Sequence, residues 1–141
     1  MVDEYTKKWL TKAMNDLKVM RNERNMKSDN LVTDAICFHA QQAVEKFLKA
    51  YLVKYDIEFG KTHNLKTLLK QCADHDADFK TVTVGDLSDY ASDYAVEIRY
   101  PDEFYEPTIE EVDENISIAE SIKEFIMKKF NIDEKDLTNK Q

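Results

Sequence analysis

The sequence predicts an all-α fold, an antiparallel up-and-down bundle of about five helices. The 141-residue chain has only two glycines and two prolines, so few positions interrupt a helix. Apolar side chains recur at helical spacing in several segments, and no segment alternates as a strand does. This length suits one domain with a proper core. We therefore expect a single domain over residues 1–141, with a core over about 4–130 and a frayed tail at 131–141.

The formal net charge of −8 is divided unevenly along the chain. Residues 1–70 carry 13 basic and 9 acidic side chains, whereas residues 71–141 carry 7 basic and 19 acidic ones. Non-specific DNA binding depends on clustered positive charge, so we expect no DNA partner for so acidic a chain. The basic first half leaves a small anionic ligand or a short RNA segment open.

Two further features concern the compartment. Cys37 and Cys72 fall on apolar stripes, which predicts reduced core cysteines and no disulfide framework. The N-terminus begins with charged residues, and no run approaches the ~18 apolar residues of a membrane span. We expect a cytoplasmic protein with no membrane partner.

The central segment, residues 31–55, has the longest uninterrupted helical pattern. Its apolar side chains, among them Val32, Ile36 and Phe47, gather on one arc that spans roughly 160°. The opposite side is mixed, because His39, Gln42, Lys46 and Lys49 follow one another at i, i+3, i+7 and i+10. Four more residues lie beside that row, namely Ala35, Phe38, Glu45 and Leu52. A solvated face rarely combines Phe and Leu with such a row, so we expect it to contact another molecule.

Two interpretations of this row stay open. As an anion-binding strip, Lys46 and Lys49 supply positive charge for a phosphate, and Gln42 supplies a donor and an acceptor for a base edge. As the seam of a homodimer, the polar groups hydrogen-bond across a twofold axis while Phe38 and Leu52 pack between them. The dimer seam is the simpler of the two, and both hold together if a ligand lies at the seam.

Four other helices are expected from the same periodicity. The first covers residues 4–26, and its exposed lysines and arginines are interpreted as a solvated face. A third helix follows the predicted cap Asn64, residues 75–83 are expected to form a loop, and a fourth helix covers 87–98. The last helix begins with the capping box Thr108–Glu111 and continues to Phe130.

Two candidate sites lie beyond the central helix. Arg99, with Tyr100 and Asp102, either aims a guanidinium at a phosphate beside an aromatic platform or satisfies the carbonyls at a helix end. His63 either binds an anion at a helix N-terminus or is part of the turn. In an up-and-down bundle, His63 and Arg99 should lie near residues 51–55. His39 should lie about 24 Å away, since sixteen residues rise 1.5 Å each.

Metal and cofactor chemistry are poorly supported by the sequence. The three histidines have neither an i, i+4 partner nor a CxxC companion, and no glycine-rich phosphate loop occurs. No Ser or Cys has a recognisable base near it in the sequence. We therefore expect no metal and no cofactor.

Three motifs resemble one known family. The run Phe38–Ala43, followed by Glu45-Lys46 and Leu48–Ala50, looks like the signature helix of HEPN domains. Thr62–Leu65 is similar to the second short motif of that family, and Arg99–Asp102 is similar to its third. Three separated motifs in the right order make the resemblance specific for the family, and it covers about residues 4–130.

This resemblance implies an α-helical bundle that forms a homodimer and is encoded with a minimal nucleotidyltransferase as a toxin–antitoxin-like pair. One branch of HEPN domains is a metal-independent ribonuclease with an Arg followed four to six residues later by His. Here Phe104, Tyr105 and Glu106 follow Arg99 at those positions. The resemblance therefore implies the branch with an Arg-Tyr-Pro motif, for which nucleotide binding is expected and ribonuclease activity is not.

The sequence leaves three functions to compare. The first is a non-catalytic homodimeric module that holds a nucleotide or its phosphate and acts with a nucleotidyltransferase. The second is a divergent ribonuclease that uses Arg99 for phosphate and His39 or His63 as the acid–base group. The third is a purely architectural dimeric adaptor.

Overall fold

A computed structural model describes residues 2–85, 87 and 106–138. These residues contain five α-helices and no β-strand, which confirms the predicted all-α bundle. The α-helices are α1 (Glu4–Arg24), α2 (Thr33–Lys54), α3 (Leu65–His75), α5 (Ile109–Phe130) and α6 (Lys135–Thr138). Two short 3₁₀ helices accompany them, η1 (Ser28–Asn30) and η2 (Ala77–Thr81). None of the described helices combines the length and apolarity that crossing a bilayer requires.

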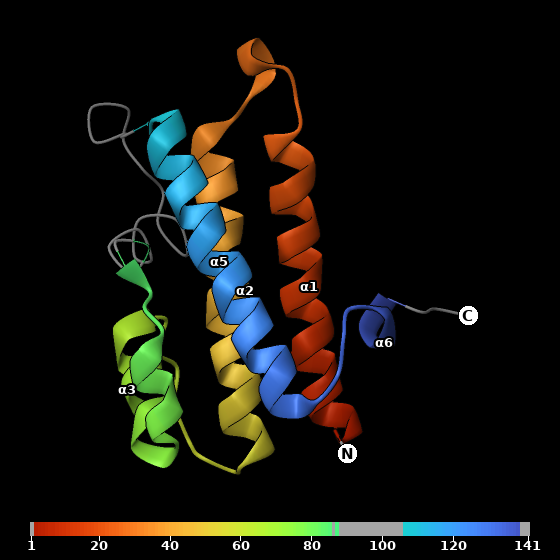
Figure 1. The fold of residues 1–141 in the computed structure, drawn as a ribbon, viewed down its shortest axis with the longest axis vertical. Coiled ribbons are helices and arrows are strands. Elements are labelled where there is room, and N and C mark those ends of the chain that lie inside the picture. Colours follow the sequence, from red (N-terminus) through yellow and green to blue (C-terminus); the bar gives the residue numbers. More distant parts are fainter. Residues whose placement is uncertain (1, 86, 88–105, 139–141) are drawn as a thin grey trace.

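Helix α2 is the centre of the bundle, in contact with α1, α3 and α5 (Figure 1). It is one unbroken helix, as predicted, and Ile36, Ala40 and Phe47 on its apolar arc are fully buried. Val32 is an exception on that arc, because it caps the helix and is largely exposed. The buried surface extends further round α2 than the predicted arc, since three neighbouring helices enclose it.

The directions of the helices differ in part from an up-and-down bundle. Helix α1 is antiparallel to α2, because the Val32 amide donates to Glu23 near one end while Lys49 lies against Trp9 near the other. Helix α3 runs in the same direction as α2. Its Cys72 Sγ donates to the Leu48 carbonyl, and three residues later on both helices His75 is hydrogen-bonded to the Tyr51 hydroxyl. Residue numbers therefore increase in the same direction along both helices.

The parallel arrangement of α2 and α3 is a consequence of their connection. Residues 56–64 run back beside α2 before α3 begins (Figure 1). His63 therefore lies against Glu45, its Nδ1 2.7 Å from Glu45 Oε2. The expectation that His63 lies near residues 51–55 was wrong, because it assumed a connection that turns directly into an antiparallel helix.

Side-chain caps fix the helix starts that the sequence predicted. The Asn64 side chain accepts a hydrogen bond of 2.9 Å from the Thr67 amide at the start of α3. At α5, the Thr108 hydroxyl and the Glu111 carboxylate form a reciprocal capping box. Each cap satisfies backbone N–H groups that have no partner within the helix.

The chain end departs from the predicted frayed tail. After α5 the backbone turns at Asn131, with φ of 57°, and α6 packs beside α1. Leu137 of α6 is buried at 5% exposure, and the Arg21 guanidinium holds Glu134 at 3.0 Å. Arg21 and then Lys123 lower the pKa of Glu134 to about 2. An apolar anchor and an ion pair thus hold residues 132–138 on the bundle.

Two other sequence predictions concern the segment after α3. Residues 75–83 were expected to form a loop, yet they contain η2, which buries Phe79 beside Tyr51 with ring centroids 4.6 Å apart. The predicted fourth helix lies almost entirely outside the described residues. The same is true of Arg99, Tyr100 and Asp102.

Candidate functional site

Two carboxylates organise the polar side of α2, and the first is Asp16 of α1. It accepts from His39 Nδ1 at 2.8 Å and also pairs with Lys46 Nζ. Antiparallel packing of α1 on α2 brings these three side chains together. Two members of the predicted row are therefore already paired within the chain.

The second carboxylate is Glu45, which is almost fully buried at 4% exposure. One of its oxygens accepts from Gln41 Nε2 at 2.9 Å, and the other lies 2.7 Å from both Lys49 Nζ and His63 Nδ1. Gln42 donates to the Gln41 side-chain oxygen at 3.0 Å. The structure thus connects Gln42, Glu45 and Lys49 of the central helix with His63, which the sequence treats as a separate candidate.

Lys49 lies in an aromatic environment. Its Nζ is 5.2 Å from the ring centroid of Phe59 and 6.0 Å from that of Trp9, and those two rings pack edge to face. At 6% exposure, this lysine is a buried cation held by Glu45 and by the ring faces. Lys49 was predicted to extend toward a ligand, whereas in this structure its ammonium group is buried and paired with Glu45.

The predicted dimer seam is also reduced. Leu52 has 0% exposure and Glu45 has 4%, so both are buried within their own chain and offer almost no surface to a partner. The sequence placed them on an outer face because a helical wheel describes one helix and does not include the elements that pack on it. Ala35 and Phe38 remain half-buried, at the other end of α2.

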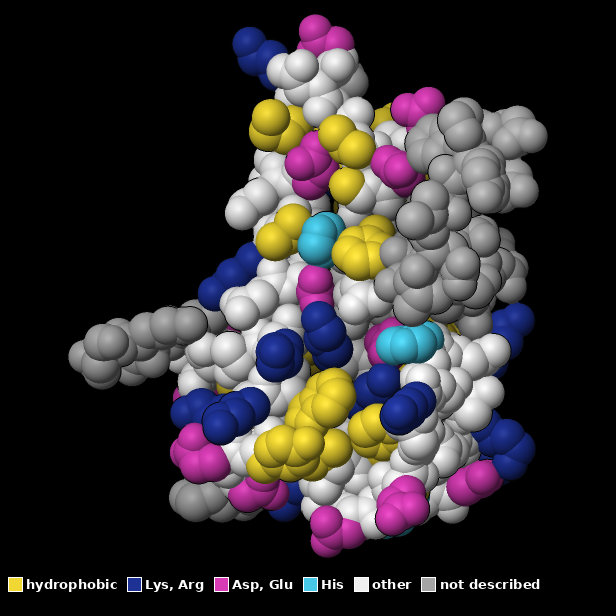
Figure 2. Space-filling view, turned by 180° about the vertical axis from the view of Figure 1, so that it is seen from behind, with side chains coloured by type: hydrophobic (Ala, Val, Ile, Leu, Met, Phe, Trp, Pro, Cys, Tyr) yellow, Lys and Arg dark blue, Asp and Glu magenta, His cyan; other side chains and the backbone are white. Residues whose placement is uncertain are grey.

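A groove between α1 and α2 was not among the predicted sites. We call it the lysine groove, and it has a volume of about 330 Å³. Its lining is Tyr5, Lys8, Trp9, Lys12 and Lys46. Figure 2 shows this face, with lysine or arginine side chains gathered beside a hydrophobic patch and near two histidines. The signal in the sequence is the i, i+3, i+4, i+7 spacing of Tyr5, Lys8, Trp9 and Lys12 on α1. From the sequence alone, the lysines of this helix are interpreted only as part of a solvated face.

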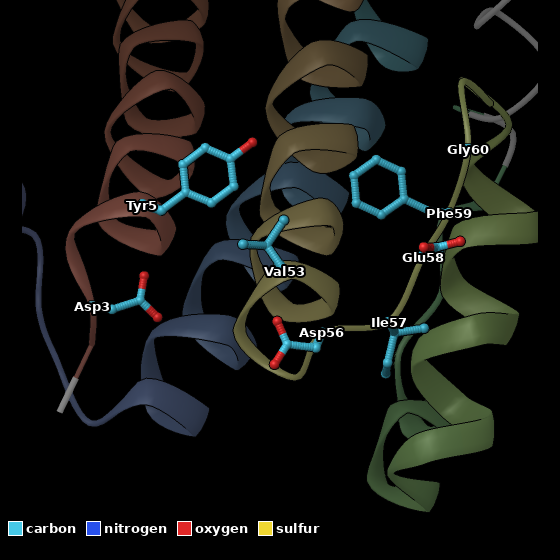
Figure 3. Close-up of a pocket in the computed structure, with 8 residues that line it drawn as sticks. All are labelled: Asp3, Tyr5, Val53, Asp56, Ile57, Glu58, Phe59 and Gly60. Carbon is cyan, nitrogen blue, oxygen red and sulfur yellow. The ribbon is translucent and has the colours of Figure 1, made fainter.

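A second, larger groove lies beside it, with a volume of about 730 Å³. We call it the acidic groove, and it is lined by Asp3, Tyr5, Val53, Asp56, Ile57, Glu58, Phe59 and Gly60. Figure 3 shows the carboxylates of Asp3 and Asp56 on one side of the Tyr5 and Phe59 rings. Tyr5 lines both grooves.

Comparison with protein families now adds to this geometry. The family model described as the HEPN domain matches residues 6–130. The chain belongs to the HEPN domain family. The resemblance inferred from the three motifs is thereby confirmed. No curated protein and no solved structure matches the chain.

Two of the three histidines of this HEPN domain, His39 and His63, are held in the same way. Nδ1 of His39 faces Asp16, and Nδ1 of His63 faces Glu45. When the carboxylate accepts the Nδ1 proton, Nε2 of a neutral imidazole is a proton acceptor. The His63 side chain is half-exposed. In this tautomer Nε2 can accept a proton or a hydrogen bond, and only the protonated imidazolium could donate a hydrogen bond to a phosphate.

No group of three or more His, Cys, Asp or Glu side chains in the described part of this HEPN domain could hold a metal ion. Cys37 and Cys72 are both buried and free, as predicted. Burial raises the pKa of the Cys72 thiol to about 12, so this thiol is not a nucleophile at neutral pH.

Proposed function

We propose that this HEPN domain is a non-catalytic, homodimeric binding module of the cytoplasm that holds a nucleotide or its phosphate. We propose further that it acts with a minimal nucleotidyltransferase in a toxin–antitoxin-like pair. The lysine groove carries the proposal, since Lys8 and Lys12 have no carboxylate partner among the described residues. Cations beside exposed rings are the side chains that nucleotide recognition uses.

Apolar side chains at the other end of the α1–α2 pair support the dimer. Val32, Ala35 and Phe38 follow one another along the first turns of α2 and are exposed or half-buried. Contacts of Glu23 with Val32 and of Asp16 with His39 place the exposed Val19 of α1 level with Ala35. We propose this apolar end as the interface. Sedimentation equilibrium should give a dimer that Phe38→Glu dissociates, and a monomeric parent chain would contradict the proposal.

Thermal unfolding with a nucleotide panel tests the ligand. At 100 times its Kd, a bound nucleotide adds about 2.7 kcal/mol, which raises the Tm of a domain of this size by roughly 10 °C. Lys46→Gln should reduce that shift, whereas Lys70→Gln, which removes an exposed lysine paired with Asp74, should leave it unchanged. No Tm shift with any nucleotide would contradict the ligand part of the proposal.

The protein partner needs a separate experiment. Co-expression with the protein encoded next to it should yield a complex that contains a nucleotidyltransferase. A neighbour without that activity, or no complex at micromolar concentrations, would contradict this part.

A second candidate, a metal-independent ribonuclease, is favoured by the pairing of His39 and His63 with carboxylates. An imidazole oriented by a carboxylate is a common general base. We would assign phosphate binding to Arg99 and proton transfer to one of these histidines. This function would be established if the chain cleaves RNA in EDTA and if Arg99→Ala, together with either His63→Ala or His39→Ala, abolishes the cleavage. Intact RNA, or cleavage that these changes leave unaffected, would remove it.

A further inference from the structure

The two grooves beside α1 have opposite charge and share one aromatic residue. Among the described residues, the lysine groove is lined by Lys8, Lys12 and Lys46 and by no acidic residue. Within the same part of the chain, the acidic groove is lined by Asp3, Asp56 and Glu58 and by no basic residue. Tyr5 lines both and is 61% exposed. A ligand that lies across Tyr5 therefore meets cations at one end and carboxylates at the other.

The ring system at this junction is suited to stacking. Tyr5 and Trp9 are one helical turn apart on α1, and both line the lysine groove. Trp9 is held by the edge-to-face contact with Phe59, at an interplanar angle of 88°. Flat aromatic ligands stack on such rings whatever their exact substituents. The junction thus supplies a place for a base.

The charged groups on each side are available for a ligand to different degrees. Lys12 lies seven residues after Tyr5, about 10 Å along the helix axis, which is within reach of a phosphate on a base-stacked nucleotide. On the other side, both Asp3 oxygens are occupied by Thr6. The Asp56 and Glu58 carboxylates form no hydrogen bond or ion pair with a described side chain, and carboxylates accept hydrogen bonds from hydroxyl groups.

We infer that the two grooves together bind a nucleoside that has a 5′-phosphate and a free 2′,3′-diol. The base stacks on Tyr5 and Trp9, the phosphate meets Lys8, Lys12 and Lys46, and the ribose hydroxyls donate to Asp56 and Glu58. The inference deepens the proposed function, on which it rests, by naming the class and the polarity of the nucleotide. Free nucleoside 5′-phosphates and the 3′ end of single-stranded RNA both carry this group.

The same arrangement of charges predicts which nucleic-acid ends bind less well. A 3′-phosphate would lie against the carboxylates of the acidic groove, and like charges at close range repel. A deoxyribose lacks the 2′-hydroxyl donor that distinguishes RNA from DNA. RNA that ends in a 3′-hydroxyl should therefore bind better than the same RNA with a 3′-phosphate or than the corresponding DNA.

The single tryptophan of the chain reports on this site directly, because it is Trp9. Titration of the full chain should show saturable quenching of its fluorescence by AMP or by hexa-adenylate with a free 3′ end. Binding of the 3′-phosphorylated and deoxy hexamers should be about 10-fold weaker. Binding of AMP alone identifies a free nucleotide as the ligand, binding of the 3′-hydroxyl hexamer alone identifies an RNA 3′ end, and binding of both shows that the site accepts either source.

Two double variants assign the groups, and a third is the matched control. Lys8→Gln with Lys12→Gln should weaken binding roughly 10-fold and reduce the salt dependence of hexamer binding by about 1.4 logarithmic units per decade of salt. Lys66→Gln with Lys80→Gln, which removes two exposed lysines that line neither groove, should leave both quantities unchanged. Asp56→Asn with Glu58→Gln should abolish the discrimination against the 3′-phosphate while AMP still binds.

Failure of this inference is distinguishable from failure of the proposed function. If nucleotides raise the Tm but neither double variant changes their affinity, the nucleotide lies elsewhere and only the inference falls. If 3′-phosphorylated RNA binds as well as 3′-hydroxyl RNA, the assignment of the diol is wrong. If no nucleotide quenches Trp9 or changes the Tm, the inference and the ligand part of the proposed function fall together.

Discussion

Replacing Lys49 by Met should destabilise the domain strongly, because it leaves the Glu45 carboxylate buried without its closest cation. The two side chains are 8% and 5% exposed, and Lys49 Nζ lies 2.7 Å from Glu45 Oε2. Removing one member of a buried ion pair costs about 3–5 kcal/mol. We expect the lower end, about 3 kcal/mol, since His63 contacts the same oxygen at 2.7 Å. Met keeps most of the aliphatic stem between the rings of Trp9 and Phe59.

The matched comparison is the double variant Lys49→Met with Glu45→Gln. The neutral amide that Glu45→Gln introduces still presents an oxygen to Gln41 Nε2, whose present bond to Glu45 is 2.9 Å, and no unpaired charge is left. The double variant should therefore lose less than about 1.5 kcal/mol, which is at most about half of the loss expected for the single variant. Urea unfolding followed by helical circular dichroism measures both losses. With a urea m-value of about 2 kcal/mol/M, the single change lowers the midpoint by about 1.5 M.

One result would refute this reasoning. If the single and double variants lose the same free energy, the cost comes from packing of the Lys49 stem against the aromatic rings. His63 and solvent would then be sufficient to stabilise the charge of Glu45, and the Lys49–Glu45 ion pair would contribute little to the stability of this part of α2.

Three further changes test other parts of the fold. Thr108→Ala removes the hydroxyl that caps α5 and should cost about 1 kcal/mol in urea unfolding; an unchanged midpoint would show that the capping box is dispensable. Gly85→Ala should cost about 1–2 kcal/mol, because Gly85 has φ of 49° and a Cβ there would lie 2.7 Å from Ile118 Cδ1, and Ile118→Val should recover only the steric part. The folded pKa of Glu134, about 2, is below its ordinary 4.5, so its contribution is complete above pH 4.5 and is lost as the pH falls towards 2. Since this carboxylate is one-third exposed, Glu134→Gln should cost only about 1 kcal/mol at pH 7 and should flatten the acid limb of stability against pH; an unchanged acid limb would contradict the importance of the pair with Arg21.

The helices themselves could be predicted from local sequence. Helical periodicity, the cap Asn64 and the capping box at Thr108 act within a few residues, so they are visible without knowledge of the neighbours. The observed ends, Glu4–Arg24, Thr33–Lys54 and Ile109–Phe130, fall within two residues of the predicted ones. The two buried cysteines followed from the same stripes. Three motifs were sufficient to identify the family.

The candidate site was predicted only in part, because a helical wheel describes one helix alone. It placed Glu45, Lys49 and Leu52 on an outer face, yet all three are buried, and Lys49 lies against Trp9 of α1 and Phe59 of the connection. Asp16, the partner of His39 and Lys46, lies more than twenty residues away in the chain. No spacing rule within one helix could have selected it.

The sequence by itself determined which segments are helical, where they are capped and to which family the chain belongs, since these depend on local hydrogen bonding and residue pattern. Only the tertiary structure decided which polar groups meet. The return of residues 56–64 along α2 aligned α3 parallel to it and brought His63 to Glu45. Antiparallel packing of α1 created the lysine groove beside the acidic groove. These are contacts between distant residues, whose geometry depends on how the connections run and on which side chains compete for the buried surface.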